Sequence, residues 1–202
     1  MSGLFITLEG VDGAGKSSHL AWLADWFTGR GRQVRLTREP GGTPVGERLR
    51  ELVLHEAMHP ETEALVMFAA RREHIEQVIR PGLAAGEVVI SDRFTDASFA
   101  YQCGGRGLDT ARLEVLESWV QDGLQPHLTF LFDVPTEVAA ARLAQAREPD
   151  RFERERADFH ARVRAAYLDR ARAHPRRIRV IDSSLPLEEV RRALQVELDT
   201  LA

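Results

Sequence analysis

Leu4-Phe5-Ile6-Thr7-Leu8-Glu9-Gly10-Val11-Asp12-Gly13-Ala14-Gly15-Lys16-Ser17 is the stretch that decides the fold of this 202-residue chain. An apolar run leads into a glycine, four variable residues and Gly-Lys-Ser, and a helical pattern follows, which is the order strand, phosphate-binding loop, helix. Glycines permit positive φ, so backbone N–H groups can converge on an anion, and the helix adds the positive end of its dipole. Lys16 is expected to reach the β- and γ-phosphates, and the Ser17 hydroxyl to bind Mg²⁺. The predicted triphosphate-binding residues are Gly10, Val11, Asp12, Gly13, Ala14, Gly15, Lys16, Ser17 and Ser18.

The basic residues support this interpretation. Lys16 is the only lysine among the 27 basic residues, and all the others are arginines. A compact ammonium on a flexible stem is not interchangeable with a planar guanidinium. A chain that uses arginine everywhere else but lysine here therefore indicates a working nucleotide loop.

Composition limits the class of protein. Hydrophobic residues make up 44% of the chain and charged residues 29%, so we expect one globular domain over residues 1–202. The single Cys103 excludes an internal disulfide and a multi-cysteine zinc site. No apolar run reaches ~18 residues and no signal-peptide pattern is present, so we predict a cytoplasmic protein without a membrane span. The net charge of −4 argues against a nucleic-acid polymer as partner.

Apolar runs that alternate with helical patterns predict the rest of the fold. Strands are expected at 4–9, 33–37, 87–91, 128–132 and 177–181, with helices between them. This alternation is typical of an α/β fold like that of P-loop NTPases, with a five-stranded parallel sheet and helices on both faces. The long helical pattern of 61–79 is expected to end at Pro81-Gly82.

Residues 145–156 have a different character, because they are dense in charge and interrupted by Pro149. They form either a solvated hinge between two helices or a short mobile lid that carries arginines to the transferred phosphate. The candidate lid arginines are Arg147 and Arg151.

Further candidates lie where strands end, because ligands of such sheets bind at the carboxyl ends of the strands. Asp92 follows a buried strand beside the loop and is placed to hold Mg²⁺ directly or through water. Within the helix of 61–79, Phe68 and Arg72 are four residues apart and share one face. The ring could stack on a nucleotide base while the guanidinium hydrogen-bonds it. The simpler alternative is that Phe68 is a core residue and Arg72 a surface residue.

A phosphate loop alone does not separate GTPases, motor ATPases, transporter subunits and small-molecule kinases. A GTPase is disfavoured because its Asn-Lys-x-Asp motif needs a second lysine. The arginine-rich lid favours phosphoryl transfer to a small acceptor that is shielded from water. Two alternatives stay open: a kinase of another nucleoside monophosphate, and a regulatory module that binds nucleotide without turnover.

Five motifs follow one another along the chain: Glu9-Gly10-Val11-Asp12-Gly13-Ala14-Gly15-Lys16-Ser17, Thr37-Arg38-Glu39-Pro40-Gly41-Gly42, Phe68-Ala69-Ala70-Arg71-Arg72, Asp92-Arg93-Phe94 and Ala100-Tyr101-Gln102-Cys103-Gly104-Gly105-Arg106-Gly107. In this order they resemble the thymidylate kinase family over nearly the whole chain. The resemblance implies transfer of the γ-phosphate of ATP to dTMP, with Mg²⁺, by a homodimer. Gly13 stands where one group of the family has a basic residue, so the chain is similar to the bacterial-type group, in which lid arginines supply that charge.

The resemblance also implies how dTMP would be bound. Phe68 would stack on thymine, and Arg72 and Gln102 would hydrogen-bond its polar edge. Tyr101 would lie against the 2′ position of the sugar, and Asp12 would approach the 3′-hydroxyl. Residues expected around the phosphate of dTMP are Arg38, Glu39, Arg50, Arg93 and Ser98.

The remaining implied roles concern ATP and the metal. The ATP base would lie between Arg142 and the loop at Asp182. The metal would be held by Ser17, Asp92 and Glu39, and the catalytic cations would be Lys16, Arg93, Arg147 and Arg151. The chain departs from the family's pattern at Phe94, Ala97 and Cys103, and at Arg71, where an acidic residue is common.

Overall fold

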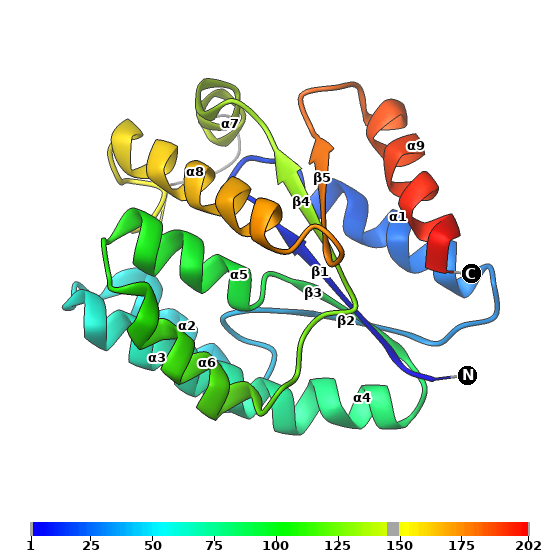
Figure 1. The fold of residues 1–202 in the computed structure, drawn as a ribbon, viewed down its shortest axis with the longest axis horizontal. Coiled ribbons are helices and arrows are strands. Elements are labelled where there is room, and N and C mark those ends of the chain that lie inside the picture. The colour runs from blue at the N-terminus through cyan, green and yellow to red at the C-terminus, as the bar shows by residue number, and fades with distance from the viewer. Residues whose placement is uncertain (1, 145–149, 202) are drawn as a thin grey trace.

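The computed structural model describes residues 2–144 and 150–201. In this part of the chain, five strands form one parallel sheet in the order β2-β3-β1-β4-β5 (Figure 1). The predicted α/β fold is therefore confirmed. The strands are β1 (Leu4–Glu9), β2 (Val34–Arg38), β3 (Val88–Asp92), β4 (Leu128–Asp133) and β5 (Ile178–Asp182).

Helices cover both faces of this sheet. Figure 1 shows α1 and α9 on one side and most of the other helices on the opposite side. Residues 2–144 and 150–201 contain no helix that is long and apolar enough to cross a membrane. The helical segments are α1 (Ser17–Thr28), α2 (Pro44–His55), α3 (Pro60–His74), η1 (Ile75–Ile79), α4 (Arg80–Ala84), α5 (Thr95–Ser98), η2 (Phe99–Gly105), α6 (Thr110–Gln121), α7 (Thr136–Leu143), α8 (Ala157–Ala173), α9 (Leu187–Leu198) and η3 (Asp199–Leu201).

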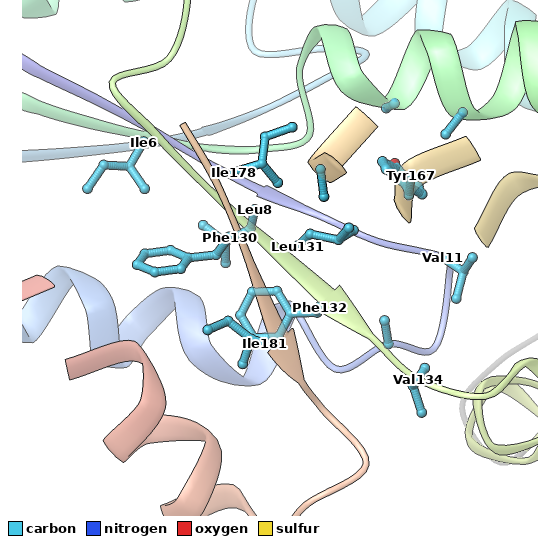
Figure 2. Packing of buried hydrophobic residues seen from close by; sticks show 14 of the residues in the cluster. Ile6, Leu8, Val11, Phe130, Leu131, Phe132, Val134, Tyr167, Ile178 and Ile181 are labelled. Atoms are coloured by element: carbon cyan, nitrogen blue, oxygen red, sulfur yellow. The ribbon is translucent and has the colours of Figure 1, made fainter. Parts of the chain in front are cut away.

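The core explains why the strands are nearly continuous apolar runs. Phe130 and Phe132 of β4 and Ile181 of β5 point toward the side of α1 and α9, whereas Tyr167 comes from α8 on the other side (Figure 2). Strands that are covered on both faces must be apolar on both faces. All of these side chains are buried.

One helical region differs from the prediction, and a second lies in a stretch for which no structure was predicted. The helix of 61–79 does not end at Pro81-Gly82. Instead it passes through a π-helical turn, η1, into α4, and Pro81 stands in the first turn of α4. The glycine-rich stretch after Ser98 is also helical: α5 continues into the π-helical turn η2. Such turns are frequent at functional sites, and η2 carries Tyr101 and Gln102.

The register of the sheet brings the predicted site residues to one edge. Leu8 of β1 and Arg38 of β2 both pair with Asp92 of β3, so three strands end side by side. The loop after β1 and the segments after β2 and β3 therefore leave the sheet together, as parallel strands require.

Candidate active site

The loop between β1 and α1 is closely packed against α7. Gly13 has a φ of 79°, and a Cβ at this position would lie 2.3 Å from the carbonyl oxygen of Ala139. A side chain here would be strained and would collide with backbone. Val11 and Ala14 are buried, so they contribute backbone groups to the loop, and Ser17 and Ser18 begin α1.

Lys16 lies inside this loop with only 6% of its surface exposed. Its Nζ donates hydrogen bonds to the carbonyl oxygens of Gly10 at 3.0 Å and Val11 at 3.1 Å. Burial, together with the positive charge of Arg93, lowers the pKa of the Lys16 ammonium, while Asp92 and Asp12 act in the opposite direction. The loop thus holds a poorly solvated cation, which is a strong site for phosphate oxygens.

Arg93 connects the loop to the helix that contains η2. Its Nη2 donates to Oδ1 of Asp12 at 2.7 Å and to the hydroxyl of Tyr101 at 2.9 Å. Tyr101 in turn donates to Oδ2 of Asp12 at 2.8 Å. Burial alone would raise the pKa of the Asp12 carboxyl, but Arg93 and Lys16 outweigh it and hold that pKa well below its usual range.

The backbone of Arg93 is strained, with a φ of 72°, and such a conformation costs about 1–3 kcal/mol in a non-glycine residue. Three hydrogen bonds fix it. Arg93 N donates to Leu8 O at 2.9 Å, and Ser91 Oγ donates to Arg93 O at 2.7 Å. Phe94 N donates to Oε1 of the buried Glu9 at 2.8 Å. The sequence argument gave Glu9 no role, and this contact identifies it as a support of Arg93.

A pocket of about 70 Å³ lies beside Arg93. Arg50 lines it and donates to Pro40 O at 3.0 Å. Burial and the nearby charges of Arg38 and Arg93 lower the pKa of the Arg50 guanidinium. Positive side chains are therefore concentrated around this pocket. The residues that line this Arg93 pocket are Asp12, Pro40, Arg50, Leu54, Met67, Arg93, Ala97, Tyr101, Gln102, Asp150 and Phe152.

The structure places Phe68 and Arg72 elsewhere. Both line a different hollow of about 620 Å³ between α3 and α6, the α3–α6 groove. Arg72 donates to Val120 O at 3.1 Å, and Phe68 is packed in the second core cluster. Consecutive residues of a helix are about 100° apart around its axis, so Phe68 and Arg72 lie on a different face of α3 from their neighbours Met67 and Arg71. This corrects the expectation that Phe68 and Arg72 line the base pocket.

Met67 and Arg71 occupy the face of α3 that was expected for that pair. Met67 lines the Arg93 pocket. Arg71 is fully buried and donates to Ser98 Oγ at 2.9 Å and Phe94 O at 3.1 Å, while its Nη1 has no partner within residues 2–144 and 150–201. Glu63, Met67 and Arg71 recur every four residues and so share one face of α3, but Phe68 and Arg72 have the same spacing, so the spacing alone does not identify this face.

Glu39 has its carboxylate engaged by protein groups. Oε2 accepts from Arg71 Nε and Oε1 is bonded to His74 Nδ1, both at 2.8 Å. Burial opposes ionisation, but Arg71 and His74 lower the pKa of the Glu39 carboxyl overall. This differs from the expectation that Glu39 ligates the metal: both oxygens already have partners.

Ser17 and Asp92 line a common pocket of about 600 Å³, together with Arg38. Asp92 Oδ1 is buried, with no hydrogen-bond partner in the described part of the chain. A carboxylate oxygen and a hydroxyl suit Mg²⁺, which binds few protein groups and completes its shell with water and phosphate. Consistent with that sparse set, the described residues contain no group of three His, Cys, Asp or Glu that could hold a metal. Arg38 is paired with Glu47 at 2.8 Å.

The lid arginines have different outcomes. Arg147 lies outside the described residues. Arg151 donates from Nη2 to Oε2 of Glu63 at 2.6 Å and from Nε to Val53 O at 2.9 Å, so its guanidinium lies on α3 and α2 rather than on the loop of Lys16. Phe152 follows, with its ring edge-on to Tyr101 at a centroid distance of 5.6 Å. The end of the lid therefore forms one wall of the Arg93 pocket.

Arg142 of α7 donates to Ser183 O at 3.0 Å. It thereby joins α7 to the loop after β5. Its Nη1 lies 3.7 Å from the point where a Cβ on Gly15 would be, so the guanidinium is next to the phosphate loop. The predicted neighbourhood of Arg142 and the Asp182 loop is thus present.

Comparisons with known proteins agree with this geometry. The family model described as thymidylate kinase matches residues 8–194. A thymidylate kinase of Methylobacillus flagellatus is 63% identical over 192 residues, covering 95% of each chain. One of Bordetella petrii is 64% identical over 200 residues, covering 99% of this chain and 97% of the relative. A crystal structure of thymidylate kinase from Ehrlichia chaffeensis matches with a TM-score of 0.75 and 34% identity, covering 90% of this chain and 93% of that one.

Proposed function

Because the chain belongs to the thymidylate kinase family, we propose that it transfers the γ-phosphate of ATP to dTMP, giving dTDP and ADP for the synthesis of dTTP. The observation that carries this proposal is the arrangement around Arg93. Its guanidinium bonds Gly10 O and Asp12 of the phosphate loop and Tyr101 of the neighbouring pocket. One cation therefore lies between a triphosphate site and an acceptor site.

Two unpaired atoms support a pyrimidine acceptor: one belongs to Gln102, which lines the Arg93 pocket, and the other to Arg71, one helical turn after the lining residue Met67. Arg71 Nη1 is a donor and Gln102 Oε1 is an acceptor, and both are buried with no partner among residues 2–144 and 150–201. The edge of thymine offers the complementary O4 acceptor and N3–H donor. We assign base recognition to Met67, Arg71 and Gln102, with Tyr101 against the sugar. Arg50 and Arg93, with Arg38 nearby, are assigned to the phosphate of dTMP.

The chemistry then needs no general base. A phosphate monoester has a second pKa of ~6, so the acceptor is already largely a dianion at neutral pH. The protein must align two anions that repel each other and neutralise the charge of the transferred group. Lys16 and Arg93 provide cations on the two sides of that group, and Arg147 and Arg151 are the candidates that the lid would add.

The metal is part of this proposal. Ser17 Oγ and the unpaired carboxylate oxygen of Asp92 would hold Mg²⁺, directly or through water. A bound Mg²⁺ would neutralise charge on the β- and γ-phosphates of ATP. Glu39 would act on the neighbourhood only by holding Arg71 in place. Arg142 and the loop at Ser183 would border the ATP base.

We further propose a homodimer that forms through the α3–α6 groove. Leu65 of α3 and Val115 and Trp119 of α6 are large apolar side chains exposed by 56%, 68% and 77%. A second copy of the same face is the occupant that this proposal commits to. Light scattering should give twice the 22.7 kDa chain mass, and Trp119→Glu should give the single mass. A wild-type monomer would contradict the proposal.

The proposed function also includes a cytoplasmic location and no nucleic-acid polymer as partner.

An ADP-release assay with dTMP, dUMP, dCMP, dGMP and AMP tests the activity. Turnover with dTMP as a preferred acceptor is expected. Faster turnover with a monophosphate that is not a thymine or uracil nucleotide would support a different monophosphate kinase. Nucleotide binding without turnover of any acceptor would support a regulatory module.

A further inference from the structure

Glu63 is a buried carboxylate that the proposed reaction does not use. It lies in the first turn of α3 and has no exposed surface. Gln102 Nε2 donates to its Oε1 at 2.8 Å, and Arg151 Nη2 donates to its Oε2 at 2.6 Å. Arg106 Nε lies 3.4 Å away. Three donors from two separate segments, η2 with its C-cap residue Arg106 and the segment of Arg151, thus converge on this one side chain.

These contacts fix the orientation of the Gln102 amide. A carboxylate between two guanidinium groups can accept hydrogen bonds but cannot donate them. The NH₂ group of Gln102 must therefore face Glu63, because the opposite orientation would place two acceptor oxygens 2.8 Å apart. The amide oxygen is left to face away from Glu63. That oxygen, Oε1, is buried and has no hydrogen-bond partner within the described ranges.

The fixed orientation matters because Gln102 lines the Arg93 pocket. A buried carbonyl without a donor is unfavourable, and a ligand that donates a hydrogen bond removes this cost. A pyrimidine with N3–H, such as thymine or uracil, supplies that donor. Cytosine has an unprotonated N3, which would set an acceptor against an acceptor.

We propose that Glu63 is a positioning residue for acceptor specificity: it holds the Gln102 amide with its oxygen toward the base and thereby selects 2,4-dioxopyrimidine nucleotides over 4-aminopyrimidine nucleotides. The proposal rests on the proposed thymidylate kinase activity and deepens it. Arg71, whose unpaired Nη1 is a donor, adds its own preference for a 4-oxo group. Discrimination by Glu63 is therefore one part of the total.

The test compares kcat/KM for dTMP, dUMP and dCMP in the wild type and in Glu63→Gln. A glutamine at position 63 can accept or donate, so the amide of Gln102 is free to turn over. The dTMP/dCMP ratio should fall about tenfold or more, and the dTMP/dUMP ratio should stay constant because both acceptors carry N3–H. A purely structural defect would lower all three values together.

Two further variants complete the design. The double variant Glu63→Gln/Gln102→Glu exchanges the amide and the carboxylate and keeps the charge of the pair. Its carboxylate at position 102 can only accept, so the dTMP/dCMP ratio should recover. Glu61→Gln, on the exposed side of the same turn of α3, is the matched control and should leave every ratio unchanged.

Each result decides something. An unchanged dTMP/dCMP ratio in Glu63→Gln overturns the proposal, as does a wild type that uses dCMP as well as dTMP. If Glu63→Gln fails to fold, the folded double variant decides: a ratio that stays far below wild type refutes the orientation argument. Absence of dTMP turnover in the wild type would instead refute the proposed function.

Discussion

Replacing Glu9 by glutamine should change how the stability of the protein depends on pH. Glu9 is completely buried at the end of β1. Its Oε1 accepts from Phe94 N at 2.8 Å and its Oε2 accepts from Tyr167 of α8 at 2.9 Å. Burial, followed by the negative charge of Asp96 in α5, raises the pKa of the Glu9 carboxyl from 4.5 to about 8, against the opposing effects of Tyr167, Phe94 N and Arg93.

The sign follows from proton binding. Between pH 4.5 and about 8 the folded chain holds a proton on Glu9 that the unfolded chain has released. The free energy of unfolding therefore falls as pH rises through this range. The contribution of Glu9 is fully present below pH 4.5 and is lost by about pH 8. At about 1.4 kcal/mol per pH unit, it amounts to at most about 4 kcal/mol between pH 5 and 8.

Urea unfolding at pH 5, 6, 7 and 8 measures this effect. Glu9→Gln is neutral at every pH, and its amide can still accept from Phe94 N, so the fall due to Glu9 should vanish. The wild type should lose up to about 4 kcal/mol more than the variant between pH 5 and 8. The exposed Glu61→Gln should behave as the wild type. Parallel pH profiles of the wild type and Glu9→Gln would show that Glu9 is ionised in the folded protein, which refutes the reasoning.

Three other substitutions test the two faces of α3 and the role of the lid. Met67→Ala should raise KM for dTMP and should lower the free energy of unfolding only by the amount usual for truncating a buried side chain. Phe68→Ala should lower the free energy of unfolding by about 3–5 kcal/mol and leave KM near the wild-type value. If instead Phe68→Ala raises KM and Met67→Ala does not, Phe68 lines the base pocket. Arg151→Ala should lower kcat by about 10³-fold if its guanidinium reaches the transferred phosphate during turnover; a raised KM for dTMP with an intact kcat would limit Arg151 to its contact with Glu63.

The strands, the phosphate loop and the order of elements could be predicted because their signals are local. An apolar run such as 128–132 is visible in the sequence whatever packs on it, and Gly13 is required by the positive φ of its own turn. The family followed from motifs that are contiguous in sequence. Local signals of this kind do not depend on knowing which distant segments meet.

The face of α3 could not be read in the same way. Met67 and Arg71, and Phe68 and Arg72, are both spaced by four residues, and both pairs combine an apolar with a basic side chain. The helix is covered on two sides, by the Arg93 pocket and by α6, so hydrophobicity does not distinguish them. The aromatic ring of Phe68 favoured the wrong pair, because a phenylalanine suits a hydrophobic core as well as a base pocket. Phe68 belongs to the buried cluster that contains Phe94 and Phe99.

The buried carboxylates escaped prediction for a related reason: a glutamate in a helix or before a loop reads as a solvent-exposed residue until its partners are known. The partners of Glu63 come from η2 and from the lid, and those of Glu9 come from α8 and from the segment after β3. In both cases the carboxylate has no proposed contact with a substrate. It fixes a residue for which we propose such a contact, Gln102 in one case and Arg93 in the other.

Arg93 shows why such supports are needed. In the proposed reaction, a guanidinium between two anionic substrates must not follow either of them, because catalysis depends on a fixed distance between the reacting groups. The strained backbone at φ 72° would relax if it were free, and relaxation would change the position of the side chain relative to Asp12 and Tyr101. Glu9, Ser91 and Leu8 hold it from three directions. The charge that we propose to join the two sites is therefore positioned by groups that belong to neither of them.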